Sequence, residues 1–184
     1  MSWITSVKRW KFRRELEQLL STQQPHQSQA HNLLTVKRLC VLFPADASKD
    51  RRRLDTFKSE RRKEGLRTEL FGFVNERSAP EGGSFPLYSK ADLNWYGTPK
   101  EEMRKRFTEK YCDALLVLGK PDHELFNFLA QLKNCGLRVG PFSEAADNPF
   151  DVLYDPGTGG DLSEQLKTVT TIFQIANAPA TVTV

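Results

Sequence analysis

The chain has 184 residues, 39% hydrophobic and 27% charged, which suits a folded domain with a full core and excludes wholesale disorder. No stretch approaches the roughly 18 consecutive apolar residues that a membrane-spanning helix needs. The formal charge of +4 is uneven. Residues 1–20 carry five basic and two acidic side chains, residues 49–67 carry nine and four, and the remainder is acidic. Such asymmetry bears on partners rather than on fold.

The N-terminus shows basic residues without the apolar run and small-residue cleavage site of a secretory signal, so a cytoplasmic location is expected. The three cysteines, Cys40, Cys112 and Cys135, are odd in number and widely spaced, which argues against a disulfide framework or a zinc ribbon. We expect three reduced thiols, with Cys40 buried in a strand. No motif predicts a cofactor or a metal ion.

Residues 2–20 predict a basic helix, capped by Ser2, whose apolar stripe changes sides near Trp10. One face holds Trp3, Ile4, Val7 and Trp10, and the roughly opposite face holds Phe12, Leu16, Leu19 and Leu20. A membrane-surface helix needs one unbroken apolar face, so that interpretation is disfavoured. We expect the second half to dock on the chain's own domain. Trp3, Val7 and Trp10 are then predicted to contact a protein surface, either the domain itself or a second copy.

Residues 21–36 are polar and Gln-rich, and they predict a linker in which His26 and His31 are solvated rather than metal ligands. The predicted organisation is therefore an N-terminal basic helix with its linker at 1–36, an α/β domain at 37–177, and a frayed tail at 178–184.

Within the predicted domain, apolar runs alternate with helical patterns. Strands are predicted at 38–43, 70–74, 114–118, 137–140 and 150–154, with a further short one near 85–88. Helices are predicted at 49–64 after a Ser48 cap, at 99–111 after a Thr98 cap, at 122–136, and in a last segment bearing Leu162, Leu166, Val169, Phe173 and Ala176. This alternation predicts a three-layer α/β fold, Rossmann-like or flavodoxin-like, with a mostly parallel sheet of about five strands and helices on both faces.

One connection departs from this pattern. Only nine residues separate Gly140 from Phe150, fewer than a parallel crossover usually needs. The last strand is therefore expected at an edge of the sheet, with an antiparallel direction left open.

Ligands of open α/β sheets gather at the carboxyl ends of the strands. The polar residues predicted at these turns are Asp46, Ser48, Asn94, Trp95, Lys120 and Asp122, with Gly97 and Gly140 allowing close backbone approach. The glycine-rich phosphate-binding motifs and the G-x-S-x-G nucleophile motif are missing from the sequence. His123 is the only histidine of the predicted domain, and it is expected at the start of a helix. A histidine-dependent catalytic triad is therefore disfavoured, and no catalytic residue is predicted.

The segment from Asn94 to Gly97, with the sequence Asn-Trp-Tyr-Gly, has two interpretations. As a ligand site, Asn94 offers a donor and an acceptor while Trp95 stacks on a flat molecule. As a structural turn, Asn94 closes the turn, Trp95 anchors the following helix and Gly97 supplies backbone freedom. The structural interpretation is preferred.

The helix predicted at 49–64 carries a second candidate surface for a partner. Its arginines are Arg51, Arg52, Arg53, Arg61 and Arg62, and each phosphate contact by them would add salt-dependent affinity. Four acidic residues alternate with these cations and no aromatic platform accompanies them, so a solvated face is preferred over a nucleic-acid site.

The order of features resembles an uncharacterised bacterial family known as a domain of unknown function. The resemblance rests on the basic N-terminal helix, the strand 39–43 that ends near Asp46, the segment 94–97, and the run 138–140 followed by 150–153. It spans most of residues 1–175, implies the α/β fold, and brings no activity with it.

The leading hypothesis is thus a non-catalytic α/β protein that binds a macromolecular partner through its N-terminal helix and basic face. One alternative is an enzyme or sensor for a small anionic ligand at the strand ends. The other is an RNA- or ribosome-associated protein.

Overall fold

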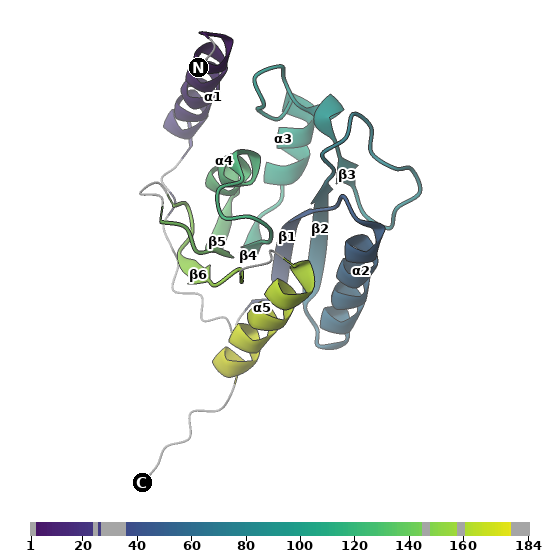
Figure 1. Cartoon of the computed structure of the whole chain (residues 1–184). Coiled ribbons are helices and arrows are strands. Elements are labelled where there is room, and N and C mark those ends of the chain that lie inside the picture. Colours follow the sequence, from purple (N-terminus) through teal and green to yellow (C-terminus); the bar gives the residue numbers. More distant parts are fainter. Residues whose placement is uncertain (1–2, 24–25, 27–35, 145–147, 158–160, 178–184) are drawn as a thin grey trace.

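The computed structural model describes residues 3–23, 26, 36–144, 148–157 and 161–177. In chain order the elements are α1 (Trp3–Ser21), β1 (Arg38–Pro44), α2 (Ser48–Lys63), β2 (Arg67–Phe73), β3 (Leu87–Tyr88), the 3-10 turn η2 (Lys90–Asp92), α3 (Glu101–Thr108), β4 (Cys112–Val117), α4 (Glu124–Leu132), β5 (Cys135–Pro141), β6 (Val152–Tyr154) and α5 (Leu162–Asn177). Figure 1 shows the sheet at the centre, with α3 and α4 on one side of it and α2 and α5 on the other.

The described strands form one six-stranded sheet in the order β3-β2-β1-β4-β5-β6, and every neighbouring pair is parallel. The predicted α/β class with a parallel sheet is confirmed, with six strands rather than about five. The two runs 39–43 and 114–118 lie side by side, since Leu39 pairs with Ala114 and Leu42 with Val117. The strand order reverses between β1 and β4.

The direction left open for the last strand is settled as parallel. Val152 pairs with Val139, so β6 starts level with the middle of β5 and runs beside it for three residues. The connecting chain therefore has to return by only about two residues of rise, roughly 7 Å. A short connection is enough for that return, which is why the usual length of a parallel crossover does not apply here.

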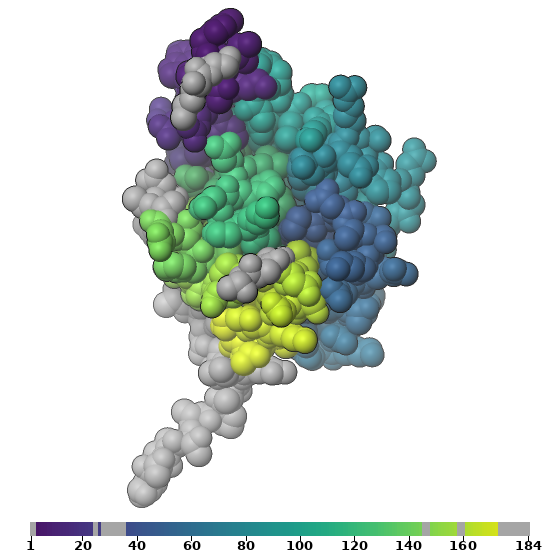
Figure 2. Space-filling view, in the orientation of Figure 1, coloured from purple at the N-terminus to yellow at the C-terminus, as the bar shows by residue number. Residues whose placement is uncertain are grey.

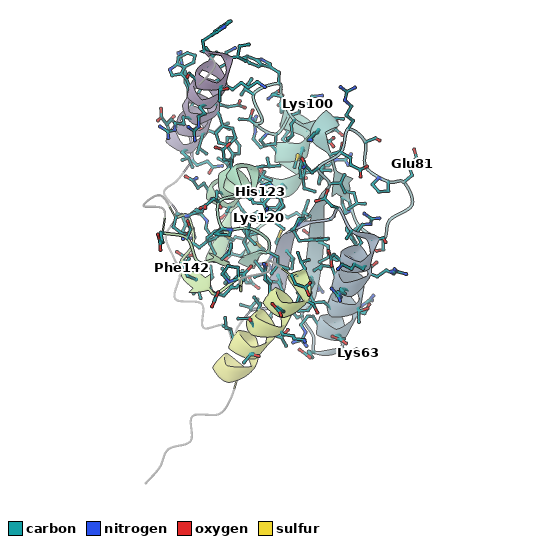
Figure 3. The ribbon with its side chains drawn as sticks, viewed as in Figure 1. Lys63, Glu81, Lys100, Lys120, His123 and Phe142 are labelled. Atoms are coloured by element: carbon teal, nitrogen blue, oxygen red, sulfur yellow. The ribbon has the colours of Figure 1, made fainter. Side chains whose placement is uncertain are left out.

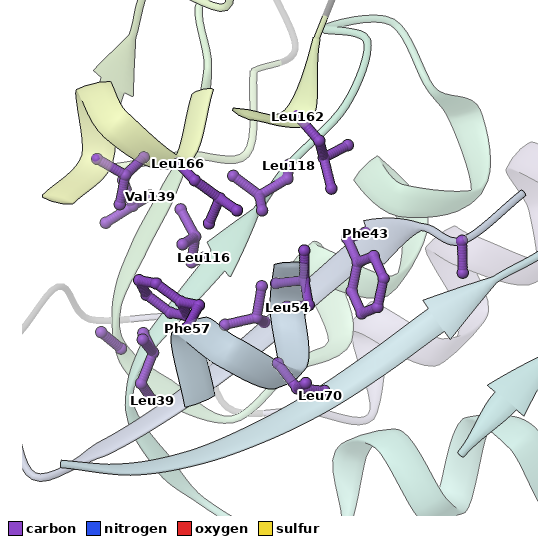
Figure 4. Packing of buried hydrophobic residues seen from close by; sticks show 14 of the residues in the cluster. Leu39, Phe43, Leu54, Phe57, Leu70, Leu116, Leu118, Val139, Leu162 and Leu166 are labelled. Carbon is purple, nitrogen blue, oxygen red and sulfur yellow. The ribbon is translucent and has the colours of Figure 1, made fainter. Parts of the chain in front are cut away.

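Each face of the sheet carries its own core, because side chains alternate along the strands. In β1, Leu39, Val41 and Phe43 point to one side, where they pack with Leu54 and Phe57 of α2 and with Leu162 and Leu166 of α5. Figure 4 shows this packing at close range. Cys40 and Leu42 point to the other side, toward Met103 and Phe107 of α3 and Leu125 and Leu129 of α4. Such runs, buried on both faces, are typical of central parallel strands.

Helix α1 lies outside these three layers and contacts α4. Phe12 meets Phe128 of α4 in an edge-to-face arrangement, with ring centroids 5.1 Å apart. Leu16 and Leu19 are half-buried, whereas Trp3, Ile4 and Trp10 are exposed. The predicted docking of the second half of this helix on the chain itself is thus confirmed.

Several predicted helix ends are wrong. Ala47 rather than Ser48 precedes α2 as the N-cap, and Lys100 rather than Thr98 precedes α3. The Thr98 hydroxyl instead donates a hydrogen bond to a carboxylate of α1. Helix α4 ends at Leu132, because Lys133 adopts an extended backbone and β5 already begins at Cys135. The predicted end of α2 near Gly65 is confirmed, since Gly65 has a φ of +85°. The proposed Ser2 cap and His31 lie outside the described residues.

Candidate functional site

Four of the six predicted ligand residues gather where the strand order reverses. Asp46 and Ser48 follow β1, and Lys120 and Asp122 follow β4. All four are exposed. The Asp46 carboxylate accepts a hydrogen bond of 2.7 Å from the Asn75 amide, and the Asp122 carboxylate accepts one of 2.7 Å from the Ser143 hydroxyl. Both carboxylates therefore serve local structure.

The backbone groups between these two turns are occupied by side chains of the same chain. The Gln165 side chain of α5 accepts a hydrogen bond of 2.7 Å from the Gly119 amide and donates one to the Gly119 carbonyl. Arg51 donates to the carbonyls of Ala45 and Asp46. Gly140 also leaves no space for a ligand, because a Cβ there would lie 2.4 Å from the ring of Phe150. The close backbone approach expected at Gly140 is thus made by a side chain of the protein.

His123 closes the start of α4 beside Lys120 (Figure 3). Its Nδ1 accepts a hydrogen bond from the Phe126 amide, and its ring stacks on Phe126 with centroids 3.9 Å apart. Burial lowers the pKa of this imidazole, while the nearby carboxylates of Asp46 and Glu124 oppose that effect. The neutral ring is the form that can accept the capping hydrogen bond.

Protonation of His123 is expected to destabilise the fold. The unfolded chain, with a histidine pKa of about 6.5, binds the proton more readily than the folded one, so the stabilising contribution is present above that pH and is lost as the pH falls through the lowered folded pKa. The free energy of unfolding should fall more steeply between about pH 7.5 and about pH 5 than in His123→Asn, whose side-chain oxygen can still cap the helix. Denaturant titrations at both pH values measure this, and parallel pH slopes would contradict it.

The Asn94–Gly97 segment lies apart from these turns, as a tight turn before α3. The Gly97 amide donates to the Asn94 carbonyl at 2.9 Å, and Gly97 has a φ of +96°. The Asn94 side chain donates to the Thr98 hydroxyl at 3.1 Å. Asn94 and Gly97 therefore have the predicted structural roles. Trp95 does not anchor α3 by burial, because 56% of its surface is exposed.

What the Asn94–Gly97 turn holds is α1. Lys11 lies over the rings of Trp95 and Tyr96, 5.0 Å and 5.7 Å from their centroids. On the neighbouring side of the helix, Glu15 accepts a hydrogen bond of 2.8 Å from the Thr98 hydroxyl and pairs with Arg104 of α3 at 3.3 Å. Its hydrogen bond with Tyr96 raises the pKa of that phenol. Glu15 thus fixes α1 against α3, and its charge is neutralised there.

The outward side of α1 combines tryptophans with cations. Trp3 and Trp10 are exposed to 75% and 54%, and they lie on the side opposite Phe12. Five exposed cations lie along α1: Lys8, Arg9, Lys11, Arg13 and Arg14. By helix periodicity, Lys8 lies on the side away from Trp3 and Trp10, and Arg14 lies beside Trp10. Among the described residues, none of these five forms an ion pair. Val7 is half-buried. We call Trp3, Trp10, Trp95 and these five cations the α1 surface.

The basic face of α2 is largely occupied with local contacts. Arg53 pairs with Asp50 and Asp161, Arg61 pairs with Glu64, and Arg51 binds the two carbonyls described above. Arg52 and Arg62 are exposed. A surface hollow of about 520 Å³ lies along the contact between α2 and α5, with Arg52, Phe57 and Lys167 among the residues around it. Helix α2 lies on the other face of the sheet from α3 and α4, far from α1 (Figures 2 and 3).

The cysteines and His26, which could in principle act as nucleophiles or metal ligands, make contacts inside the fold. Cys40, Cys112 and Cys135 are free thiols, as expected, and all three are buried on the same face of the sheet. Hydrogen bonding to Cys112 and burial raise the pKa of Cys135, which keeps that thiol protonated. His26 is not solvated as predicted, because it lies 3.1 Å from the Asp151 carboxylate.

Three polar residues that organise the fold were not among the predicted residues. Glu15 holds α1, Gln165 occupies the turn after β4, and Lys133 has its amino group buried against backbone carbonyls of residues 107 and 110. In the sequence, Glu15 and Gln165 are polar residues outside the apolar stripes of their predicted helices, where solvent exposure is expected. Lys133 follows the apolar stripe of α4, and only its position next to strand β5 could have drawn attention to it.

Comparisons with known proteins give a family and no activity. The model of a family of unknown function, DUF6913, matches residues 8–173, so the chain belongs to that family. No curated protein and no solved structure gave a match. Within the described part of the chain, no three His, Cys, Asp or Glu residues are grouped as metal ligands, and no helix is long and apolar enough to cross a membrane.

Proposed function

We propose that this member of the DUF6913 family is a non-catalytic binding protein whose α1 surface engages a macromolecular partner. The observation that carries the proposal is the exposure of Trp3, Ile4 and Trp10 on one side of a helix whose opposite side is fixed to the domain. Exposed apolar groups rimmed by charged residues are typical of interaction sites.

The way in which α1 is held supports this proposal. Phe12 packs on Phe128 from one side, and Glu15 is bound by Thr98 and Arg104 from the other. These contacts fix the rotation of the helix about its axis, so the tryptophans have to face outward. A partner would then bind a preformed surface and would lose less entropy on binding than with a mobile segment.

The proposal rests on α1 alone and leaves out the basic face of α2. The two helices lie on opposite faces of the sheet, so one flat partner could not cover both. Three of the five arginines singled out on α2 also have partners within the chain. That face therefore adds little to the argument for a shared interface.

The alternative of an enzyme or sensor at the strand ends is less well supported. The strand order is that of Rossmann-like dinucleotide-binding sheets, and a likeness of fold alone does not carry a function. At the reversal point, the Gly119 backbone is bonded to Gln165 and the Asp46 carboxylate to Asn75. Groups already satisfied within the chain are poor candidates for ligand contacts.

The test replaces exposed side chains, since deleting α1 would uncover Phe128 and create a new sticky surface. In Trp3→Ser/Trp10→Ser, the amount of macromolecule that copurifies with the tagged full-length chain should fall at least about tenfold, with an unchanged unfolding midpoint. The variant loses two aromatic contacts that the partner would bury. Each is worth about 1 kcal/mol or more of binding free energy, which accounts for that size.

The matched control is Phe142→Ser/Leu153→Ser, which removes two other exposed apolar side chains, near the β6 edge of the sheet. This control should copurify the same material as the unchanged chain. Quantitative protein and nucleic-acid analysis of the captured material, together with sedimentation to detect self-association, gives the readout. The proposal is wrong if the Trp3/Trp10 variant keeps every partner and the same mass.

A further inference from the structure

We infer that the partner of the α1 surface is a single-stranded nucleic acid, with bases stacking on the exposed tryptophans and phosphates meeting the cations between them. This inference rests on the proposed function and deepens it. Three kinds of observation carry it: the exposed tryptophans, the exposed cations and the hollows beside Trp10.

All three tryptophans of the chain are exposed, to 75%, 54% and 56% for Trp3, Trp10 and Trp95. Tryptophan is normally among the more buried residues, so this is unusual for a side chain without a partner. Trp3 and Trp10 are seven residues apart on one side of α1, about 10 Å along its axis. Trp95 reaches the same surface through Lys11, which lies over its ring. Exposed indole rings offer the stacking platforms that bind unpaired bases.

Two acidic residues, Glu15 and Glu17, lie among the cations of α1, and Glu17 lines the same hollow as Arg13 and Arg14. The acidic residue closest to the domain, Glu15, is bound to Thr98 and Arg104 and does not neutralise them. Arg14 lies 5.1 Å from the Trp10 ring centroid, in the cation–π arrangement that also favours a stacked base. Lys8, Arg9 and Arg13 remain exposed. Phosphates of a nucleic-acid backbone are the complementary anions.

The surface is hollowed on both sides of Trp10. One hollow, of about 710 Å³, follows the helix, with Arg9, Trp10, Arg13 and Arg14 among its walls. The other, of about 490 Å³, lies between α1 and the Asn94–Gly97 turn. Its lining residues include Trp10, Lys11, Arg14, Tyr96 and Arg104. Trp10 and Arg14 line both hollows, so the two adjoin at these residues. Cations outnumber carboxylates around them, since Glu17 lies in the first hollow and Glu15 in the second.

These features separate a nucleic acid from other occupants. A lipid surface would need an unbroken apolar face, whereas Arg14 and Glu17 lie on the same side of the helix as Trp3 and Trp10. The cores of protein interfaces are poor in charge, whereas here Lys11 lies over the Trp95 ring and Arg14 beside the Trp10 ring. The basic face of α2 carries cations and no exposed ring, so it serves as an internal control.

The experiment measures the affinity of the full-length chain for a labelled single-stranded oligouridylate of about a dozen nucleotides, by fluorescence anisotropy. We expect the affinity to fall about twentyfold between roughly 50 mM and 200 mM salt, as three phosphate contacts would give. Tryptophan fluorescence should be quenched on binding. An oligothymidylate and a duplex of equal length tell whether RNA, DNA or any single strand is preferred, and the duplex should bind at least tenfold more weakly.

Two variants and one control separate stacking from simple charge attraction. Trp10→Ala should weaken binding about tenfold, as the loss of one stacked base does. Arg9→Gln/Arg13→Gln should weaken binding. It should also reduce the slope of log affinity against log salt concentration by the amount that about two phosphate contacts contribute. The control Arg52→Gln/Arg62→Gln removes two exposed cations of α2 and should leave the affinity within about twofold. All these side chains are exposed, and an unchanged unfolding midpoint confirms that each variant is folded.

The inference is overturned if the oligonucleotides fail to bind at low salt while the Trp3/Trp10 variant still loses a captured protein or its self-association. In that case the proposed function stands with a different occupant. Binding only to vesicles of anionic lipid, or equal losses in the α1 and α2 variants, would overturn it as well. If the Trp3/Trp10 variant changes neither capture nor oligonucleotide binding, both the inference and the proposed function fail.

Discussion

Replacing Lys133 by Met is expected to lower the free energy of unfolding by about 2–4 kcal/mol, because the buried Phe107 carbonyl and the part-buried Lys110 carbonyl lose the amino group that donates to them. Lys133 is 2% exposed, and its amino group donates to the Phe107 carbonyl and, at 2.8 Å, to the Lys110 carbonyl. These carbonyls lie at the C-terminal end of α3, where the helix dipole favours a cation. Its charge also lies 5.0 Å from the centroid of the Phe107 ring.

Met keeps the length and apolar character of the side chain, so the loss reports the hydrogen bonds rather than a cavity. The control is Lys110→Met, which removes an exposed amino group paired with Glu69 and should leave the free energy of unfolding much less changed, because solvent screens this pair. Urea titrations of both variants measure the difference. Similar small losses in the two variants would show that the buried amino group contributes nothing special to the end of α3.

Replacing Gln165 by Leu is expected to cost about 2–4 kcal/mol, since it leaves both polar groups of the Gly119 backbone buried without a partner. Gln165 is fully buried, and it also accepts a hydrogen bond of 3.0 Å from the Tyr154 hydroxyl. These contacts tie α5 to the turn after β4 and to β6. The variant should therefore also increase amide exchange in α5 and β6 above that in α1.

Tyr154→Phe disrupts the same hydrogen-bond network less severely than Gln165→Leu. It removes a hydroxyl that contacts Gln165 and the Val117 carbonyl, and it leaves the Gly119 hydrogen bonds in place, so a loss of about 1 kcal/mol is expected. Combined with Gln165→Leu it should cost less than the two losses added together, because the residues share a network. Strict additivity would mean that the two side chains act independently.

The same network bears on the function we propose. In open α/β sheets, the place where strand order reverses is the usual ligand crevice. Here Gln165 and Arg51 take up the backbone groups around it, while Trp3, Trp10 and five exposed cations lie on α1. The side chains free to contact a partner are therefore concentrated on α1, outside the three layers of the domain. This supports a binding role for α1 over chemistry at the strand ends.

The sequence by itself determined the α/β class, the two central strands and the division of α1 into a docked and an exposed half. These features follow from local patterns, because the continuous apolar run 39–43, ended by Pro44, and the switch of the apolar side at Trp10 can be read from neighbouring residues alone. The end of α2 at Gly65 was equally local, since its positive φ favours glycine.

Only the tertiary structure decided which polar side chains turn inward and which surfaces lie together. Glu15, Lys133 and Gln165 look like solvated residues in the sequence, yet each satisfies groups that are far away along the chain. The sequence likewise placed Asn94 and Trp95 at a ligand crevice, whereas the fold brings their turn against α1. Hydrogen bonds between distant segments depend on how layers pack, and periodicity carries no information about that packing.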